Sequence, residues 1–218
     1  MKAMILAAGK GERMWPLTKD KPKPLLQAHG KTLIEHHIVN LAQAGIKDII
    51  INLWYLGLQI ENYLGDGSRY GVTLHYARET QLLDTGGGIQ NVLHFFGEEK
   101  FIVVSADIYT DFDFSTLILP DDKAAHIILV SNPEYHPFGD FALQNGIVSL
   151  IGEYKLTYAN IGIYRPEFFD QAIHPYPLSL LFKKHISRQL VTGAIYDGVW
   201  FNVGTPMELQ KVNCFHIL

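Results

Sequence analysis

The N-terminal stretch constrains what this chain can fold into more than any other part of it. Residues 3–8, Ala-Met-Ile-Leu-Ala-Ala, form a short apolar run that predicts a buried strand. The run stops at Gly9. Because Gly9 and Gly11 lack Cβ atoms, the backbone there can turn sharply and bring its N–H groups close to a ligand. A loop of free N–H groups after a buried strand is suited to binding phosphate. The sequence therefore predicts a phosphate-binding loop at the end of that strand.

Three cations, Lys10, Arg13 and Lys23, lie on or close to this loop, and Pro22 and Pro24 keep the chain extended around Lys23. We interpret the stretch as a loop that binds a polyphosphate, with Arg13 and Lys23 directed at its charge. The spacing alone also fits an ordinary turn, because a single Gly-x-Gly is a weak motif. The loop has no Gly-Lys-Ser/Thr, and a methionine stands where the dinucleotide fingerprint needs its third glycine, so neither of those motifs is present.

Composition narrows the class of protein. The chain has 218 residues, of which 48% are hydrophobic and 18% charged, and this predicts one globular domain with a sizeable core. A net charge of -4 argues against general binding to nucleic acid or to an acidic membrane surface. The single cysteine, Cys214, excludes a disulfide framework and a cysteine-based zinc site. The oligomeric state stays open, and the sequence is compatible with a monomer.

The start of the chain also bears on where the protein works. Met1 and Lys2 lead directly into the predicted strand, which leaves no room for a cleaved signal peptide. No stretch is long and apolar enough for a membrane span. We therefore expect a cytoplasmic protein.

Strand and helix patterns alternate along the first half of the chain. Strands are predicted at 46–52, 72–77 and 101–104, and helices at 33–45, 56–64 and 86–96. The second half is mixed, with strands predicted at 125–130, 158–164, 191–196 and 199–203, a hairpin within 141–151, and helices starting at Pro166, Leu178 and Thr205. Such alternation predicts an α/β fold with a largely parallel sheet and helices on both of its faces.

Asp107 follows the apolar run at 101–104 and is the first candidate for a metal ligand. Ligands of open parallel sheets bind outside the carboxyl ends of the strands, where the loop at 9–13 also lies, so we expect Asp107 beside that loop. A carboxylate next to a polyphosphate usually needs a cation between them, and Mg²⁺ fits because it prefers oxygen ligands. An aspartate that only caps a turn fits the same spacing.

The whole N-terminal string is longer and more specific than these short motifs. It resembles the signature of the sugar-1-phosphate nucleotidylyltransferases, and the resemblance runs from residue 2 to about residue 212. The matching residues are Gly9, Gly11, Arg13, Pro16, Leu17 and Thr18, followed by Pro22, Lys23 and Pro24. The resemblance implies a Rossmann-like three-layer sandwich with a mostly parallel mixed sheet and a small sugar-facing lobe. It also implies a single domain over 1–218, with a nucleotide-facing half at about 1–107 and a sugar-facing half at about 108–218.

The same resemblance implies which residues bind the nucleotide and its metal. The nucleotide-binding residues would be Ala8, Gly9, Gly11, Arg13, Gln81 and Gly86. Among these, Gln81 and Gly86 would contact the base, because the family has a Glu or Gln and a glycine-rich turn at this place. Glycines at 86–88 fit a flexible turn equally well. In the family, an aspartate at the position of Asp107 holds magnesium, and we transfer that role to Asp107.

On the sugar side, Gly162 matches a strand glycine that the family places next to the sugar ring, although a glycine at a strand bulge fits as well. Glu153 and Lys155 are similar to the family's Glu-Lys pair for the sugar phosphate, at a different spacing. Residues 200–206 match the family's Trp-x-Asp-x-Gly-Thr with one departure, because Asn202 stands where the family has its second metal ligand. An amide oxygen can ligate Mg²⁺ but brings no negative charge, so we expect weaker metal binding.

The implied reaction joins a sugar 1-phosphate to a nucleoside triphosphate and releases pyrophosphate. The sugar phosphate oxygen would attack the α-phosphorus in line. Arg13 would hold the leaving pyrophosphate, and Lys23 would neutralise the α-phosphate and the attacking phosphate, which makes both catalytic candidates.

The chain's length and its residues 84–89 and 107–114 resemble the short N-acetylmuramate 1-phosphate uridylyltransferases of this family. The expected substrates are therefore UTP and N-acetylmuramate 1-phosphate. One alternative is a nucleotidyltransferase for another acceptor, such as a hexose 1-phosphate or phosphocholine. The other is a nucleotide-sugar-binding protein without activity, because of Asn202.

Overall fold

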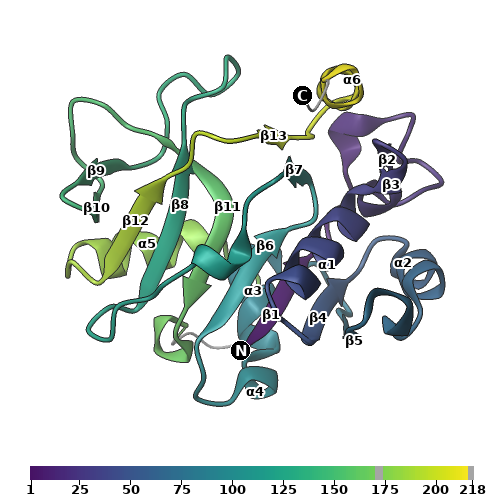
Figure 1. The fold of residues 1–218 in the computed structure, drawn as a ribbon, viewed down its shortest axis with the longest axis horizontal. Helices are drawn as coiled ribbons and strands as arrows, with labels where there is room; N and C mark the ends of the chain where they lie inside the picture. The colour runs from purple at the N-terminus through teal and green to yellow at the C-terminus, as the bar shows by residue number, and fades with distance from the viewer. Residues whose placement is uncertain (170–173, 216–218) are drawn as a thin grey trace. The chain divides into compact units, whose positions relative to one another are not determined.

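The computed structural model describes residues 1–169 and 174–215 (Figure 1). These residues form two compact units. The loop unit comprises residues 3–82, 104–115 and 199–215, and the central unit comprises residues 1–2, 83–103, 116–169 and 174–198. Each unit is assembled from stretches that lie far apart in the sequence. The predicted halves, 1–107 and 108–218, cut across these units, and the single-domain organisation stays a prediction.

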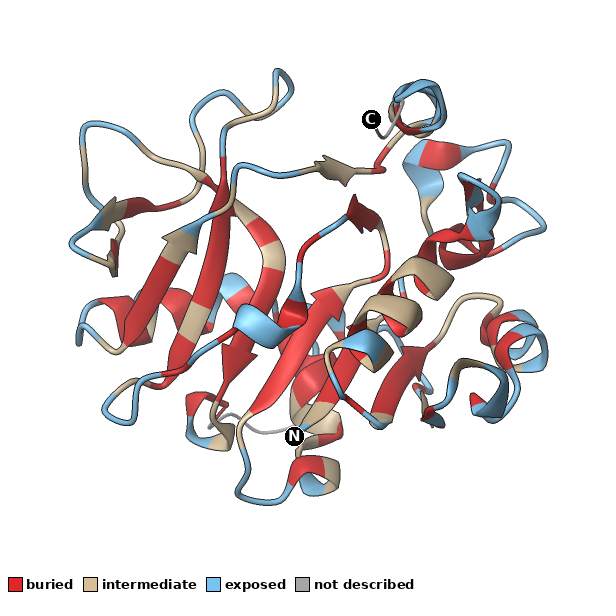
Figure 2. Cartoon of the chain, in the orientation of Figure 1, coloured by how far each residue is buried: buried red, intermediate tan, exposed pale blue. Residues whose placement is uncertain are grey.

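Parallel strands form the sheet of the loop unit. Strand β1 (Lys2–Leu6) pairs with β4 (Asp48–Leu53), and β4 pairs with β5 (Thr73–Arg78). The connections run through α1 (Leu33–Gln43) and α2 (Gly57–Leu64), which confirms the predicted alternation. Every residue of β4 except its first is buried (Figure 2), as expected for a parallel strand covered on both faces.

Shorter elements complete the loop unit. They are the 3₁₀ helices η1 (Glu12–Met14), η2 (Lys23–Leu25) and η3 (Ser68–Tyr70), the hairpin of β2 (Gln27–Ala28) and β3 (Lys31–Thr32), the pair of β7 (Ile108–Thr110) and β13 (Trp200–Asn202), and the helix α6 (Pro206–Cys214). Helix α6 begins as predicted, because the Thr205 hydroxyl accepts from the Glu208 N–H at 3.3 Å and Pro206 takes the first position. The sequence did not predict β2, β3 or β7.

The central unit has a mixed sheet. Its strands, in spatial order, are β11 (Thr157–Tyr164), β8 (Ala125–Val130), β12 (Val191–Ile195), β10 (Ile147–Ser149) and β9 (Ala142–Gln144). Strand β8 runs parallel to β12, and the other pairs are antiparallel. The turn between β9 and β10 has positive φ at Asn145 and Gly146, 50° and 77°, which confirms the predicted hairpin.

The remaining elements are β6 (Phe101–Ser105), α3 (Asp84–Asn91), α4 (Leu93–Phe96), α5 (Leu178–Ile186), η4 (Phe114–Thr116) and η5 (Pro166–Phe168). Two helix predictions are wrong in their bounds. The glycines at 86–88 lie inside α3, which ends before Val92, so 86–96 is not one helix. Pro166 starts only a 3₁₀ helix, and residues 170–173 beyond it lie outside the described residues.

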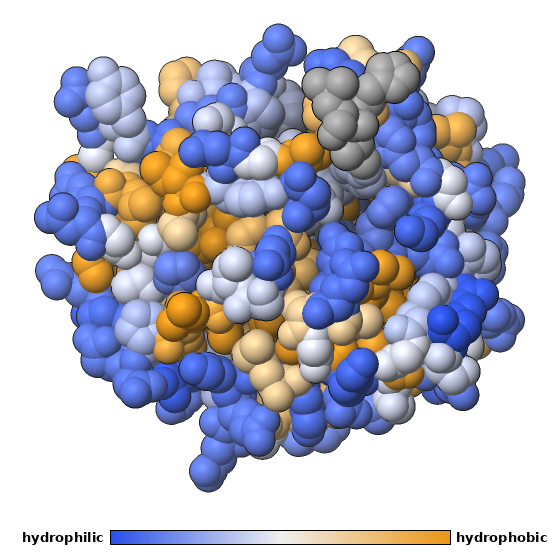
Figure 3. Space-filling model, in the orientation of Figure 1, coloured by the Kyte–Doolittle hydropathy of each residue, from blue (hydrophilic) through white to orange (hydrophobic). Residues whose placement is uncertain are grey.

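Aromatic side chains fill the core of the central unit. The rings of Phe96 and Phe101 stack with 3.8 Å between their centroids, and Tyr164 and Phe182 meet Phe168 edge-on at 5.2 Å and 5.6 Å. At the surface, the face in Figure 3 shows hydrophilic side chains around scattered apolar ones. Over residues 1–169 and 174–215, no helix has the length and apolar character needed to cross a membrane.

Candidate active site

The loop that follows β1 is fixed at one glycine and open at the other. Gly11 has φ 64°, in the left-handed region, and a Cβ there would lie 3.2 Å from the Lys23 Cβ. The Gly11 carbonyl accepts from the Thr18 hydroxyl at 2.7 Å and from the Met14 N–H at 2.9 Å. Gly9 is exposed, and a Cβ there would meet nothing within 4 Å. The loop therefore keeps its shape while leaving space around Gly9 for a ligand.

Lys23 and Asp107 form an ion pair beside this loop. Lys23 Nζ lies 2.8 Å from Asp107 Oδ2, with 9% of the lysine side chain and 34% of the aspartate side chain exposed. The residue before Asp107, Ala106, donates its N–H to the carbonyl of Leu6, the last residue of β1, at 2.9 Å. Asp107 thus lies at the loop end of β1, as its strand-end position predicts. A carboxylate has about four acceptor positions, so Asp107 can take a further partner besides Lys23.

The side-chain amide oxygen of Asn202 is buried. It ends β13 opposite Ile108, the residue after Asp107, and the neighbouring Val203 N–H donates to the Asp107 carbonyl at 2.8 Å. In the part of the chain that the structure describes, Asn202 Oδ1 has no hydrogen-bond partner. A buried acceptor left in this way costs about 1–3 kcal/mol, and such atoms call for an explanation, of which a bound ligand is one.

Asp107 and Asn202 together fit a metal site that a substrate completes. Nowhere in residues 1–169 and 174–215 do three His, Cys, Asp or Glu side chains gather closely enough to hold a metal. Mg²⁺ is usually bound through one or two protein carboxylates together with substrate phosphates and water. The donor set here is the carboxylate of Asp107, just before β7, and the buried amide oxygen of Asn202 at the end of β13, which suits an ion that arrives with a polyphosphate.

Arg13 lies against the start of α6. A Cβ on Gly204 would lie 3.3 Å from an Nη atom of Arg13 and 3.1 Å from Glu208 Oε2, so the glycine lets the guanidinium approach the backbone. Lys10 is engaged elsewhere, with its Nζ 3.5 Å from the Glu12 carboxylate and 5.4 Å from the centre of the Trp54 ring. Of these two cations, Arg13 is the one held next to the motif that contains Asn202.

Sequence reasoning missed two buried hydrogen bonds that connect the start of the loop to Asn52 and Glu79. Asn52, near the end of β4, accepts from the Ala7 N–H at 2.9 Å and donates to the Glu79 carboxylate at 2.7 Å. Asn52 is 3% exposed and Glu79 9%. The signal that could have revealed them is a polar residue at the carboxyl end of each of two neighbouring strands. Gln81, predicted to contact the base, is exposed and follows Glu79 closely in the chain.

Gly86 is packed against another segment of the central unit. Its N–H donates to the Tyr176 carbonyl at 2.9 Å, and a Cβ there would lie 2.2 Å from the Tyr176 ring. A Cβ on Gly87 would lie 2.3 Å from the His174 carbonyl oxygen. The glycines are thus explained by the close approach of residues 174–176 to α3. The base contact assigned to Gly86 stays a prediction.

The sugar-side candidates also lie in the central unit. Strand β11 shifts register against β8 between Tyr158 and Gly162, and a Cβ on Gly162 would lie 2.8 Å from the Tyr164 ring. The strand irregularity considered for Gly162 is therefore present. Glu153 is exposed and Lys155 half-buried, and the Lys155 carbonyl accepts from the Asn132 amide at 2.8 Å. The sugar-binding roles of these three residues stay predictions.

His37 supports the strand that follows Asp107. Its ring is fully buried, and Nε2 lies 2.8 Å from the Ile108 carbonyl oxygen. Burial lowers the pKa of His37 from the ordinary 6.5 to about 4, although the bond to Ile108 and the charge of Asp107 oppose this change. A neutral imidazole can bond to a carbonyl only as a donor, so we place its proton on Nε2.

The sequence is similar to a known protein family over nearly its whole length. The sequence model described as "Nucleotidyl transferase" matches residues 2–217. The chain belongs to the nucleotidyl transferase family. It is 44% identical to the N-acetylmuramate alpha-1-phosphate uridylyltransferase of Neisseria meningitidis, over 97% of this chain and 96% of that protein. It is 32% identical to the enzyme of that name from Caulobacter vibrioides, over 94% and 92%.

Solved structures agree on the fold. A Bacillus anthracis candidate glucose-1-phosphate thymidylyltransferase superposes with a TM-score of 0.86 at 23% identity, covering 98% of this chain and 94% of that one. This likeness confirms the predicted α/β Rossmann-like sandwich. As a member of the nucleotidyl transferase family the chain is a sugar-phosphate nucleotidyltransferase, and such enzymes generally use a divalent metal.

Proposed function

We propose that this nucleotidyltransferase joins UTP and N-acetylmuramate 1-phosphate to give UDP-N-acetylmuramate and pyrophosphate. The observation that carries the proposal is the near full-length similarity to two uridylyltransferases named for this acceptor. It is supported by a glycine loop in which Gly11 lies against Lys23 of the Lys23–Asp107 pair and Gly9 is left open. The product would return N-acetylmuramate to cell-wall precursors, a role in peptidoglycan recycling. A cytoplasmic location, where nucleoside triphosphates are available, is part of the proposal.

The chemistry needs charge neutralisation and alignment, and no covalent intermediate with the protein. An oxygen of the sugar phosphate forms a bond to the α-phosphorus of UTP while the bond from that phosphorus to the β-bridging oxygen breaks, and pyrophosphate carries away the electron pair. Lys23 would neutralise the attacking phosphate and the α-phosphate, and Arg13 would hold the pyrophosphate. Ala8, Gly9 and Gly11 would bind the triphosphate through backbone N–H groups.

The remaining roles follow the same assignment. Asp107 and Asn202 would hold Mg²⁺, which when bound supplies positive charge to the phosphates. Gln81, together with Gly86, would contact the base. Gly162, Glu153 and Lys155 would contact the acceptor.

The test is pyrophosphate release by the whole chain with Mg²⁺, UTP and N-acetylmuramate 1-phosphate. Matched reactions replace the acceptor with hexose 1-phosphates or phosphocholine, and UTP with the other triphosphates. We expect turnover with the first pair to exceed every other combination. Faster turnover with another acceptor would overturn the substrate assignment. Nucleotide binding without turnover, in both the natural chain and Asn202→Asp, would favour a binding protein over an enzyme.

A further inference from the structure

Asn52 joins the ends of three neighbouring strands through its side chain. Its Oδ1 accepts from the N–H of Ala7, the first residue after β1, at 2.9 Å, and its Nδ2 donates to Oε1 of Glu79, the first residue after β5, at 2.7 Å. Asn52 itself belongs to β4, which pairs with both strands. Both hydrogen bonds are buried. One side chain therefore fixes the backbone at the start of the phosphate loop and the carboxylate at the start of the segment 79–81.

The position of these bonds suggests more than fold stability. Leu6 is the last residue of β1 in register with β4, lying opposite Asn52, so Ala7 is where the chain leaves the ladder and enters the loop. On the other side, the Glu79 N–H donates to the Leu53 carbonyl at 2.8 Å and extends the β4–β5 ladder by one residue. Burying an amide and a carboxylate costs desolvation free energy, and an apolar pair would pack the same strands without that cost.

We propose that Asn52 is a positioning residue that sets the phosphate loop in register with the segment 79–81. This inference rests on the proposed function, in which the loop binds the triphosphate and Gln81 contacts the base. The two ends of the nucleotide are then held at a fixed separation by a hydrogen-bonded chain that touches neither of them. Loss of that register should weaken nucleotide binding and leave acceptor binding unchanged.

The relay, by which we mean the two hydrogen bonds from Asn52 to Ala7 and Glu79, can be broken and restored by exchanging donor and acceptor. Asn52→Asp removes the donor and faces the Glu79 carboxylate with a second carboxylate. Glu79→Gln alone keeps an acceptor for the Asn52 amide. In the double variant Asn52→Asp/Glu79→Gln, the glutamine amide donates to the new carboxylate, which still accepts from Ala7 N–H. The relay is restored with its polarity reversed.

The experiment measures the dissociation constant of the best-bound nucleoside triphosphate by calorimetry in the wild-type chain and the three variants. Leaving a buried polar group unpaired is expected to weaken binding about tenfold or more in Asn52→Asp. In the Glu79→Gln background, the same substitution should weaken triphosphate binding less than about threefold. The difference between the two backgrounds is the coupling expected of two side chains in direct contact. In Asn52→Asp alone, binding should strengthen as the pH falls, because one shared proton recreates the missing donor.

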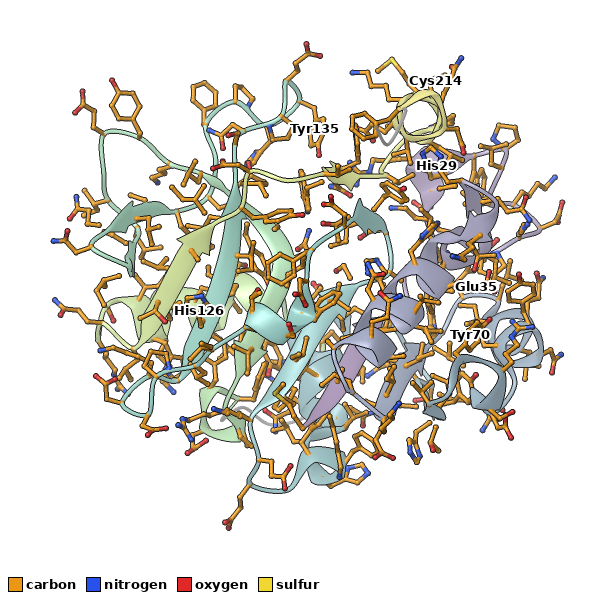
Figure 4. All side chains as sticks on the ribbon, viewed as in Figure 1. His29, Glu35, Tyr70, His126, Tyr135 and Cys214 are labelled. Carbon is orange, nitrogen blue, oxygen red and sulfur yellow. The ribbon has the colours of Figure 1, made fainter. Side chains whose placement is uncertain are left out.

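Tyr70→Phe is the matched control. The Tyr70 hydroxyl donates to a Glu35 carboxylate oxygen at 2.7 Å in the same unit, and both residues, labelled in Figure 4, lie outside the loop and the segment 79–81 in the sequence. This variant should lower the melting temperature and leave triphosphate affinity unchanged. The Michaelis constant for the acceptor should change less than twofold in all variants.

Three results would overturn the inference. They are unchanged triphosphate affinity in Asn52→Asp, equal losses for triphosphate and acceptor, and no recovery in the double variant. The proposed function fails in a different way, by triphosphate binding without turnover in the wild-type chain. In that case the effect of the Asn52 and Glu79 variants on the triphosphate dissociation constant can still be measured. No triphosphate binding at all would overturn both.

Discussion

At the scale of single residues, Lys23 is the side chain on which the proposed chemistry most depends. Its ammonium group is 2.8 Å from Asp107. A metal ion would compete with Lys23 for the Asp107 carboxylate, and the substrate phosphates would compete with Asp107 for the Lys23 ammonium group. Lys23→Met keeps the length of the side chain and removes its charge. We expect kcat to fall about 10²–10³-fold, as when one charge-stabilising group is removed from an active site.

The same variant should have the opposite effect on metal binding. A partly exposed ion pair is worth about 1 kcal/mol, so freeing Asp107 should raise the affinity of the protein alone for Mn²⁺ about threefold to tenfold, measured by electron paramagnetic resonance. Lys21→Met, at an exposed neighbouring position, is the control and should change neither quantity. Unchanged turnover in Lys23→Met would remove this residue from the mechanism.

His37 makes a prediction about pH. Its pKa is lowered to about 4 in the folded chain, from 6.5, so between these values the unfolded chain binds the extra proton. Folding stability should therefore be fully present above pH 6.5 and decline as the pH falls toward 4, by at most about 3 kcal/mol from this group.

Urea unfolding at pH 7 and pH 5 would measure this decline. His37→Gln keeps a donor for the Ile108 carbonyl and cannot titrate, so its stability should fall less between the two pH values. His94→Gln, at an exposed position, should behave like the natural chain. Equal declines in all three proteins would contradict the assignment to His37.

Single residues also show how far sequence reasoning reaches. Gly11, Lys23 and Asp107 could be proposed because a long, specific string and a strand-end position identify them; the structure places Lys23 against Asp107, and the roles of all three stay predictions. Asn52 and Glu79 were missed because each looks like an ordinary strand-end residue, and only the pairing of β4 with β1 and β5 brings their side chains together.

At the scale of elements, glycine has different roles in helix α3 and in the loop at residues 9–13. Gly86→Ala would place a Cβ 2.2 Å from the Tyr176 ring and 3.0 Å from the Tyr176 carbonyl oxygen. We expect it to lower the free energy of unfolding by about 1–3 kcal/mol, the usual cost of overpacking. Gly9→Ala meets nothing within 4 Å, so stability should change by less than about 0.5 kcal/mol.

The variants Gly86→Ala and Gly9→Ala should also differ in nucleotide binding. Gly9→Ala should weaken triphosphate binding, because the loop backbone at this position is proposed to approach the phosphates. Thermal melts and calorimetric titrations of both variants measure the two effects separately. A stable Gly86→Ala would show that residues 174–176 can move away from α3.

Elements with local signals were predictable, and those made by distant pairing were not. The Asn145–Gly146 turn and the Thr205–Pro206 helix start are confirmed because their signals lie within a few residues. Strand β7 was missed because it has three residues, too few for any periodicity, and pairs with β13 about 90 residues later. The predicted bounds 86–96 are wrong for α3 because they start the helix at its glycines, whereas tertiary packing holds these glycines inside a helix that runs over Asp84–Asn91.

At the scale of the whole molecule, the family and the fold class could be predicted, but the grouping of residues could not. The predicted division near residue 107 follows the order of the chain and stays a prediction. The loop unit combines residues 3–82 with 104–115 and 199–215. Because these three stretches belong to one unit, Arg13, Lys23, Asp107 and Asn202 lie in the same unit. No local sequence pattern predicts this grouping.

We propose above all that the chain transfers the nucleotidyl group of UTP to N-acetylmuramate 1-phosphate. The most direct measurement is the fate of phosphorus label in UTP incubated with the whole chain, Mg²⁺ and this acceptor. Label at the α-phosphorus should appear in UDP-N-acetylmuramate, and label at the γ-phosphorus should appear only in pyrophosphate. Release of the α label as UMP, or its retention in UTP while Mg²⁺ and both substrates are present, would contradict the proposed reaction.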